Sequence, residues 1–218
     1  MTKQSIEVIS EKLRRDIILG TLKSGEHIIE KKIAKSLKFS RIPVREALKI
    51  LEGEGFVEKF PNKGNFVKKL TSEYADELAI LYETLVPILL KDAIPHYTKR
   101  TYNNAEKILI KMRKSNDSVE IGYLIWDFKK QLFKQTKYKF ILSIIENVYK
   151  QSLRLISILI ENMNQKSFNI SIYEKILELC KQKKGDEAVN LFMEFFNVEK
   201  NLLTKWFNSN GLNQNGIE

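Results

Sequence analysis

Residues 40–67 read SRIPVREALKILEGEGFVEKFPNKGNFV, and the period of the hydrophobic pattern changes within them. Up to Leu51 the apolar residues return every three or four positions, which is typical of one buried helix face. Two glycines, Gly53 and Gly55, then end the helical pattern. FVEKF (56–60) and NFVKK (65–69) alternate apolar and polar residues on either side of a turn sequence, PNKG, so they predict two strands joined by a tight turn.

Two further helices are predicted before this stretch. From Ser5 to Leu19 apolar residues recur with helical spacing, and Gly20 stands where such a helix would end. A second helix is predicted from about Glu30 to Leu37, and the hydroxyl of Ser40 is predicted to cap the third. Three helices followed by a two-stranded ribbon are the outline of a winged helix-turn-helix, whose third helix enters the major groove of DNA beside the wing.

The charge of the chain is concentrated in the same region. The chain has 218 residues and a net charge of +10, and residues 1–70 carry 16 Lys and Arg against 9 Asp and Glu. A basic surface attracts phosphate groups and releases their counterions, so double-stranded DNA is the expected partner. A lysine-rich surface that only keeps the protein soluble is the alternative interpretation.

The stretch from about Ser5 to Leu70 resembles the DNA-binding domain of the GntR family of bacterial transcription regulators, whose hallmark run is nearly intact in residues 40–67. The resemblance implies DNA contacts by six residues: Lys31, Ser40, Arg41, Arg45, Lys63 and Gly64. In the family, the positions of the two arginines contact bases and that of the serine contacts phosphate. An arginine can bind guanine O6 and N7 together, and glycine lets the wing backbone approach DNA closely. A solvated face held by weak surface ion pairs is the alternative for the arginines.

The remainder of the chain is predicted to be almost wholly helical. Amphipathic segments cover residues 72–97, 101–115, 119–135, 138–163, 170–183 and 186–208. We therefore expect a mainly α protein with a winged helix-turn-helix domain at 1–70, an all-α bundle at 71–209 and a disordered tail at 210–218. The order of the helices resembles the FCD effector domain of the FadR branch of the GntR family. That resemblance implies that the helical bundle contains a ligand pocket and that the protein dimerises through the bundle.

The FCD resemblance also implies a metal ion held by an aspartate and three histidines, and the chain departs from this pattern. The family string D-x-x-F-H falls on IWDFK at residues 125–129, so its aspartate and histidine are both missing. The chain has only two histidines, His27 and His96, and neither can rebuild the cluster. Lysine and tyrosine are poor replacements for neutral imidazole, so we expect no metal and no other cofactor.

A metal-free effector pocket remains an expectation. Its predicted border consists of Tyr82, Trp126, Lys129, Tyr173 and Asn197. The alternative is that these aromatic residues, which recur at helical spacing, only fill the core.

Other features narrow the class of protein. No stretch approaches the roughly 18 apolar residues that span a membrane, and the single cysteine, Cys180, fits a reducing compartment, so we expect a soluble cytoplasmic protein. The sequence shows no nucleophile–base pair and no phosphate-binding glycine loop, so we do not expect an enzyme. The expected function is a homodimeric transcription regulator, a repressor, that binds a short palindromic operator, either under control of a small-molecule effector or independently of any ligand. The alternative is a winged-helix protein-interaction module without sequence-specific DNA binding.

Overall fold

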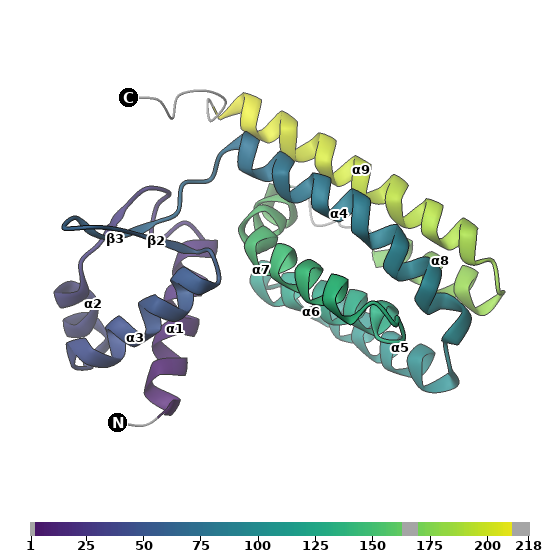
Figure 1. The fold of residues 1–218 in the computed structure, drawn as a ribbon, viewed down its shortest axis with the longest axis horizontal. Helices are drawn as coiled ribbons and strands as arrows, with labels where there is room; N and C mark the ends of the chain where they lie inside the picture. The colour runs from purple at the N-terminus through teal and green to yellow at the C-terminus, as the bar shows by residue number, and fades with distance from the viewer. Residues whose placement is uncertain (1–2, 163–169, 211–218) are drawn as a thin grey trace. The chain divides into compact units, whose positions relative to one another are not determined.

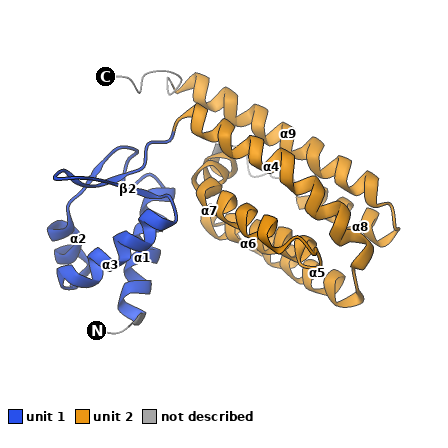
Figure 2. Ribbon diagram, viewed as in Figure 1, with its two compact units in different colours: residues 1–70 blue, residues 71–218 orange. Residues whose placement is uncertain are grey.

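The computed structural model describes residues 3–162 and 170–210, and it divides into two compact units, Met1–Leu70 and Thr71–Glu218 (Figure 2). We call these unit 1 and unit 2. The described residues are mainly helical, and among them strands occur only in unit 1 (Figure 1). The predicted fold class, a winged helix-turn-helix followed by an all-α region, is confirmed. All but the first residue of the predicted tail, 210–218, lies outside the described residues.

Unit 1 has the helix and strand order of a winged helix-turn-helix. Its elements are α1 (Lys3–Ile18), β1 (His27–Ile28), α2 (Glu30–Leu37), α3 (Arg41–Gly53), β2 (Val57–Phe60) and β3 (Gly64–Val67). The strands form one antiparallel sheet in the order β1-β3-β2. The sequence predicted only the β2–β3 ribbon, because β1 has two residues and no alternating pattern to reveal it.

The core of unit 1 lies between α1 and α3. Ile9, Leu13 and Ile17 on α1 are at most 1% exposed, and the apolar stripe of α3 that includes Leu48 and Leu51 is equally buried. These residues recur at helical spacing on each helix, so the two buried faces meet. The burial of one face of α3 leaves its other face to solvent, and this outer face carries the candidate DNA contacts.

Unit 2 is a bundle of helices. Its elements are α4 (Ser72–Ala93), the short 3-10 helix η1 (Ile94–His96), α5 (Lys99–Lys114), α6 (Ser118–Phe133), α7 (Lys139–Asn162), α8 (Ile170–Lys181) and α9 (Gly185–Ser209). Helix α4 packs against α7 and α9, and α5 packs against α6 and α8. The helix α4 continues through Pro87, which is tolerated although proline lacks the N–H that an interior helical residue donates. No helix in the described ranges has the length and apolar content to cross a membrane.

Candidate functional site

The outer face of α3 presents two arginines to solvent. The side chains of Arg41 and Arg45 are 58% and 55% exposed, and Ile42 between them is 56% exposed. Because the opposite face of the helix is buried, these side chains cannot turn into the core. Arginine side chains at positions i and i+4 lie on the same side of a helix, so both guanidinium groups are available to one ligand.

A carboxylate from α2 lies between the two arginines. Arg45 Nε donates a hydrogen bond to Glu30 Oε2 over 2.7 Å, and Arg41 Nη2 lies 3.5 Å from the same oxygen. Glu30 is the first residue of α2, so its charge also suits the positive end of that helix. Sequence reasoning missed this residue, although an acidic residue 11 and 15 positions before two solvent-facing arginines was visible in the sequence.

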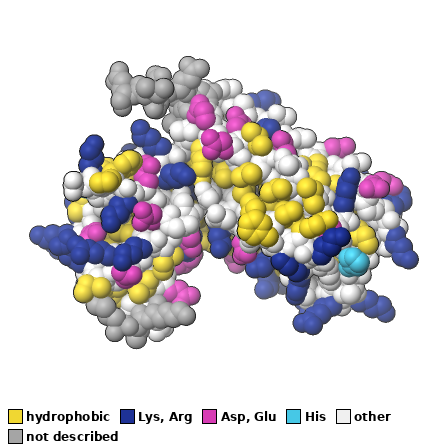
Figure 3. Space-filling model, viewed as in Figure 1, with side chains coloured by type: hydrophobic (Ala, Val, Ile, Leu, Met, Phe, Trp, Pro, Cys, Tyr) yellow, Lys and Arg dark blue, Asp and Glu magenta, His cyan; other side chains and the backbone are white. Residues whose placement is uncertain are grey.

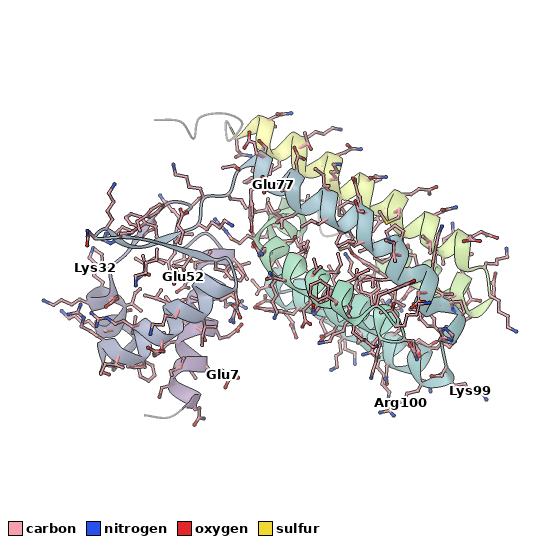
Figure 4. All side chains as sticks on the ribbon, viewed as in Figure 1. Glu7, Lys32, Glu52, Glu77, Lys99 and Arg100 are labelled. Carbon is pink, nitrogen blue, oxygen red and sulfur yellow. The ribbon has the colours of Figure 1, made fainter. Side chains whose placement is uncertain are left out.

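The two other helix positions that were singled out are both exposed. Lys31 lies on the first turn of α2, where basic side chains project from unit 1 (Figure 3); Figure 4 labels its neighbour Lys32. Ser40 occupies the N-cap position of α3, but its side chain makes no capping hydrogen bond. The predicted hydroxyl cap is therefore wrong, and the Ser40 hydroxyl stays free to accept or donate elsewhere.

The wing is a tight turn between β2 and β3. Lys63 is exposed at its tip, and its backbone N–H donates to the carbonyl of Phe60 over 3.2 Å. Gly64 has a φ of +96°, and a Cβ atom at this position would lie 2.9 Å from His27 Nε2. His27 stacks on Phe66 of β3 with the ring centroids 4.6 Å apart. A glycine is therefore required here both by the backbone and by the close approach of the imidazole.

Unit 2 contains a cavity of about 100 Å³ between α4, α6, α7 and α9. Its walls include the charged side chains of Lys129 and Glu199 and the phenols of Tyr82 and Tyr149. Lys129 is only 5% exposed, and its ammonium lies 4.9 Å from the centroid of the Tyr82 ring and 5.3 Å from that of the Tyr149 ring. An ammonium held over aromatic faces is stabilised by the ring quadrupoles.

Burial disfavours the charged form of each of these groups and shifts its pKa accordingly. Burial lowers the pKa of Lys129, whereas the negative charge of Glu199 acts to raise it. Burial also raises the pKa of Glu199, an effect that Lys129 opposes, and it raises the pKa of Tyr82 well above 10. A ligand that neutralised either charge would therefore relieve a desolvation cost.

The five residues predicted to border a pocket are placed differently. Tyr82 and Lys129 both line the cavity. Trp126 stacks on Tyr149, and Tyr173 packs against Phe128 and Phe195 in the core. Asn197 is exposed on α9, and none of these last three predicted residues lines the cavity.

Sequence reasoning missed Tyr149 and Glu199, although α9 carried a signal for the second of them. Four inward positions of that helix, at 192, 196, 203 and 207, are apolar, and residue 199 falls on the same face. A charged residue on an apolar helix face requires a partner or a polar cavity.

Two remaining features bear on metals and on catalysis. Within residues 3–162 and 170–210, no group of three or more His, Cys, Asp or Glu side chains could hold a metal ion. Cys180 is buried, and burial raises the pKa of its thiol to about 12. A thiol that stays protonated at neutral pH is a poor nucleophile, so this cysteine is structural.

Comparison with known proteins identifies the N-terminal unit. The family described as "Bacterial regulatory proteins, gntR family" matches residues 5–67. A Bacillus subtilis protein named as the uncharacterized HTH-type transcriptional regulator YdhC is 37% identical over 76 residues, which are 35% of this chain and 33% of that protein. The matches span a third to about half of the length of the first curated relatives.

Solved structures resemble the chain over nearly its full length. A GntR family transcriptional regulator from Pseudomonas syringae pv. tomato is 26% identical, with a TM-score of 0.60 over 95% of this chain and 87% of that one. The E. coli protein McbR/YncC has a TM-score of 0.74 at 20% identity, over 95% and 100% of the two chains, and so shares the fold. Residues 5–67 thus form a winged helix-turn-helix domain that matches the gntR family of bacterial regulatory proteins.

Proposed function

We propose that the protein is a transcription regulator that binds double-stranded DNA through α3 and the wing. One observation carries the proposal: Arg41 and Arg45 stand exposed on the solvent face of α3 within a matched GntR domain. Each guanidinium group can donate two hydrogen bonds to guanine in the major groove. Ile42, exposed between them, can pack on a thymine methyl group.

The other predicted contacts supply affinity for the DNA backbone. Lys31 and Lys63 are exposed lysines that can neutralise phosphates, and the free Ser40 hydroxyl can donate to a phosphate oxygen. Gly64 has no side chain of its own, so the wing backbone at this residue can approach DNA closely. Backbone contacts of this kind position the protein, and the arginines then read the bases.

The protein acts as a homodimer, and the exposed face of α4 is the proposed interface. Ile80, Thr84 and Ile88 form a stripe along this helix, and Ile80 and Ile88 are 60% and 41% exposed. Thr84 between them is also exposed, and its hydroxyl donates to the carbonyl of Ile80, which satisfies it within the helix. Figure 3 shows hydrophobic side chains gathered on the visible face of unit 2 in the region of α4.

A second copy fits this stripe because its charges are symmetric about Thr84. Glu77 lies seven residues before Thr84 and Lys91 seven residues after it, both exposed (Figure 4 labels Glu77). When two α4 helices pair antiparallel about a two-fold axis at Thr84, Glu77 of each chain faces Lys91 of the other. Self-complementarity of this kind is what a two-fold interface requires, and a two-fold protein matches a palindromic operator.

Repression follows from occupancy of the operator, and a small-molecule effector in the cavity of unit 2 controls it. The cavity, the buried Lys129 and the half-buried Glu199 support this part of the proposal. An effector shifts DNA binding only if it binds one state of the protein more tightly than the other. No metal is needed for this, because the lining supplies its own charges.

Selection of random double-stranded DNA at near-physiological salt tests the proposal. The wild-type protein is expected to enrich a palindromic sequence, and Arg45→Ala is expected to lose roughly 1–3 kcal/mol of discrimination at one base pair of each half-site. Arg100→Ala, which removes an exposed arginine of α5 in unit 2 (labelled in Figure 4), is the matched control and should select the wild-type sequence. If the wild-type protein enriches no sequence, it is not a sequence-specific regulator.

A further inference from the structure

The cavity of unit 2 holds two opposite charges that are not bonded to each other. Lys129 on α6 and Glu199 on α9 both line it, and each influences the ionisation of the other. Neither side chain makes a hydrogen bond or a close ion pair with another residue in the described ranges. A buried cation and a nearby carboxylate normally bind each other directly, since burial makes the separated charges costly.

A third polar group also lacks a partner. The hydroxyl of Tyr82, whose side chain is 4% exposed, has no hydrogen-bond partner among the described residues. The Tyr149 hydroxyl differs, because it donates to the carbonyl of Gly122 over 2.8 Å. The Tyr82 ring lies beside the Lys129 ammonium, so the cavity has two unused donors on one side. Buried polar groups in native proteins almost always have partners, so a bound molecule is expected to satisfy these donors.

The remaining charges on the cavity wall leave this arrangement unchanged. Lys200 is already paired with Glu83, with Nζ and Oε1 3.0 Å apart. Asp76 is exposed and therefore remains hydrated. The rest of the lining is largely apolar and includes Leu78, Leu155 and Leu203. The unpaired polar groups are thus two donors and one carboxylate, set in an apolar wall.

We infer that this cavity binds a small zwitterionic amino acid, whose carboxylate is held by Lys129 and Tyr82 and whose ammonium is held by Glu199. A molecule with only a carboxylate would leave Glu199 unpaired beside a second negative charge, and a simple amine would leave Lys129 unpaired. A zwitterion satisfies all three groups and adds no net charge to the site. This inference rests on the proposed effector control and gives its chemical class.

The size of the cavity limits the ligand. Its volume of about 100 Å³ is smaller than the roughly 150 Å³ of an engineered cavity that accepts benzene. The ligand therefore has about the size of alanine or γ-aminobutyrate, and its carbon chain contacts the apolar wall. A larger side chain, such as that of tryptophan, would extend beyond the cavity into solvent.

Isothermal titration of the full-length protein tests the inference with L-alanine, L-valine, β-alanine and γ-aminobutyrate. Each is compared with its matched carboxylate (propionate, 3-methylbutanoate or butyrate) and its matched amine (ethylamine, isobutylamine or propylamine). At least one amino acid is expected to bind about tenfold or more tightly than both of its matched compounds, because each of them loses one charge-assisted contact. If none of the amino acids binds, or if a matched carboxylate or amine binds equally well, the inference is wrong.

Variants locate the binding. Lys129→Met and Glu199→Gln are each expected to weaken amino-acid binding at least tenfold, whereas Lys130→Met and Glu194→Gln, which alter exposed neighbours on the same helices, should not. Far-ultraviolet circular dichroism verifies that each variant is folded. Equal binding by all four variants would place the ligand elsewhere. DNA selection by the same samples separates the two proposals, since wild-type protein that selects DNA but binds no amino acid overturns only the zwitterion site.

Discussion

Arg45 Nε on α3 donates a 2.7 Å hydrogen bond to Glu30 Oε2 on α2, and the same carboxylate lies near Arg41. Glu30 therefore lies within ion-pairing distance of both candidate base-reading arginines and favours their alignment before DNA arrives. It also places a negative charge on a surface that must approach phosphates. The pairing predicts that the Glu30 carboxylate lowers the affinity for DNA of any sequence and raises the discrimination between sequences.

Glu30→Gln tests this trade. We expect binding to random DNA to tighten, because one negative charge leaves the surface, and the ratio of specific to random affinity to fall several-fold, because the arginines lose their alignment. Fluorescence anisotropy with the selected operator and a scrambled duplex measures both affinities at one salt concentration. Glu46→Gln, which removes a charge of α3 that is paired with Lys49, is the control. Equal tightening on both duplexes would show that Glu30 acts through charge alone.

Lys63→Ala is expected to weaken DNA binding uniformly across sequences. Its ammonium is exposed at the tip of the wing, where it can neutralise a phosphate but has no base-specific geometry. The slope of log K against log salt should become shallower by about 1, which titrations at several salt concentrations measure. An unchanged slope would mean that the wing lysine does not meet the DNA backbone.

Gly64→Ala is expected to loosen the wing. The substitution requires an alanine at a φ of +96° and places its Cβ 2.9 Å from His27 Nε2, so the cost should exceed about 1 kcal/mol. Gly53→Ala is the control, because Gly53 is helical and nothing lies within 4 Å of the added carbon. Hydrogen exchange of peptides from residues 56–67 should accelerate in the first variant only. Normal protection in Gly64→Ala would show that the turn accepts a side chain.

The local hydrophobic pattern of the sequence was enough to predict α3 and the wing, but it was not enough to predict strand β1 or the whole lining of the cavity. The α3–wing stretch was predictable because its helical and alternating periods lie within one continuous run of residues. Strand β1 was not, because it exists only through its pairing with β3, which lies far along the chain. The cavity was half predictable for the same reason. Lys129 and Tyr82 were found on separate helices, but only the packing of α4, α6 and α9 shows that Glu199 joins them and that Asn197 faces solvent.

Asp92→Asn is expected to reduce the dependence of the free energy of unfolding on pH in the acid range. The Lys137 backbone N–H and the Thr136 hydroxyl each donate to Asp92 Oδ2 over 2.7 Å, and these hydrogen bonds lower the pKa of the carboxyl group below 3.8. A lowered pKa means that the charged form stabilises the fold. This contribution is present above pH 3.8 and is lost as the pH falls through the lower folded value.

Urea unfolding between pH 2.5 and 6 measures the effect through the fluorescence of Trp126 and Trp206, which both lie in unit 2. The wild-type protein should be more stable than Asp92→Asn near pH 6, and the difference should shrink at the lowest pH. Asp127→Asn removes an exposed carboxylate of α6 and serves as the control. A difference that stays constant across the range would assign the effect to the shape of the side chain instead of its charge.

A charge exchange on α4 tests the proposed dimer. Glu77→Lys alone and Lys91→Glu alone should each raise the dissociation constant of the dimer about tenfold, because two exposed attractions of roughly 0.2–1 kcal/mol become repulsions. The double variant restores opposite charges across the two-fold axis and should recover wild-type association, which sedimentation velocity measures. Glu194→Lys, an exposed substitution on α9, should have no effect. If the double variant dissociates as readily as the single ones, Glu77 and Lys91 do not face each other, and the exposed stripe of Ile80, Thr84 and Ile88 contacts something other than its own copy.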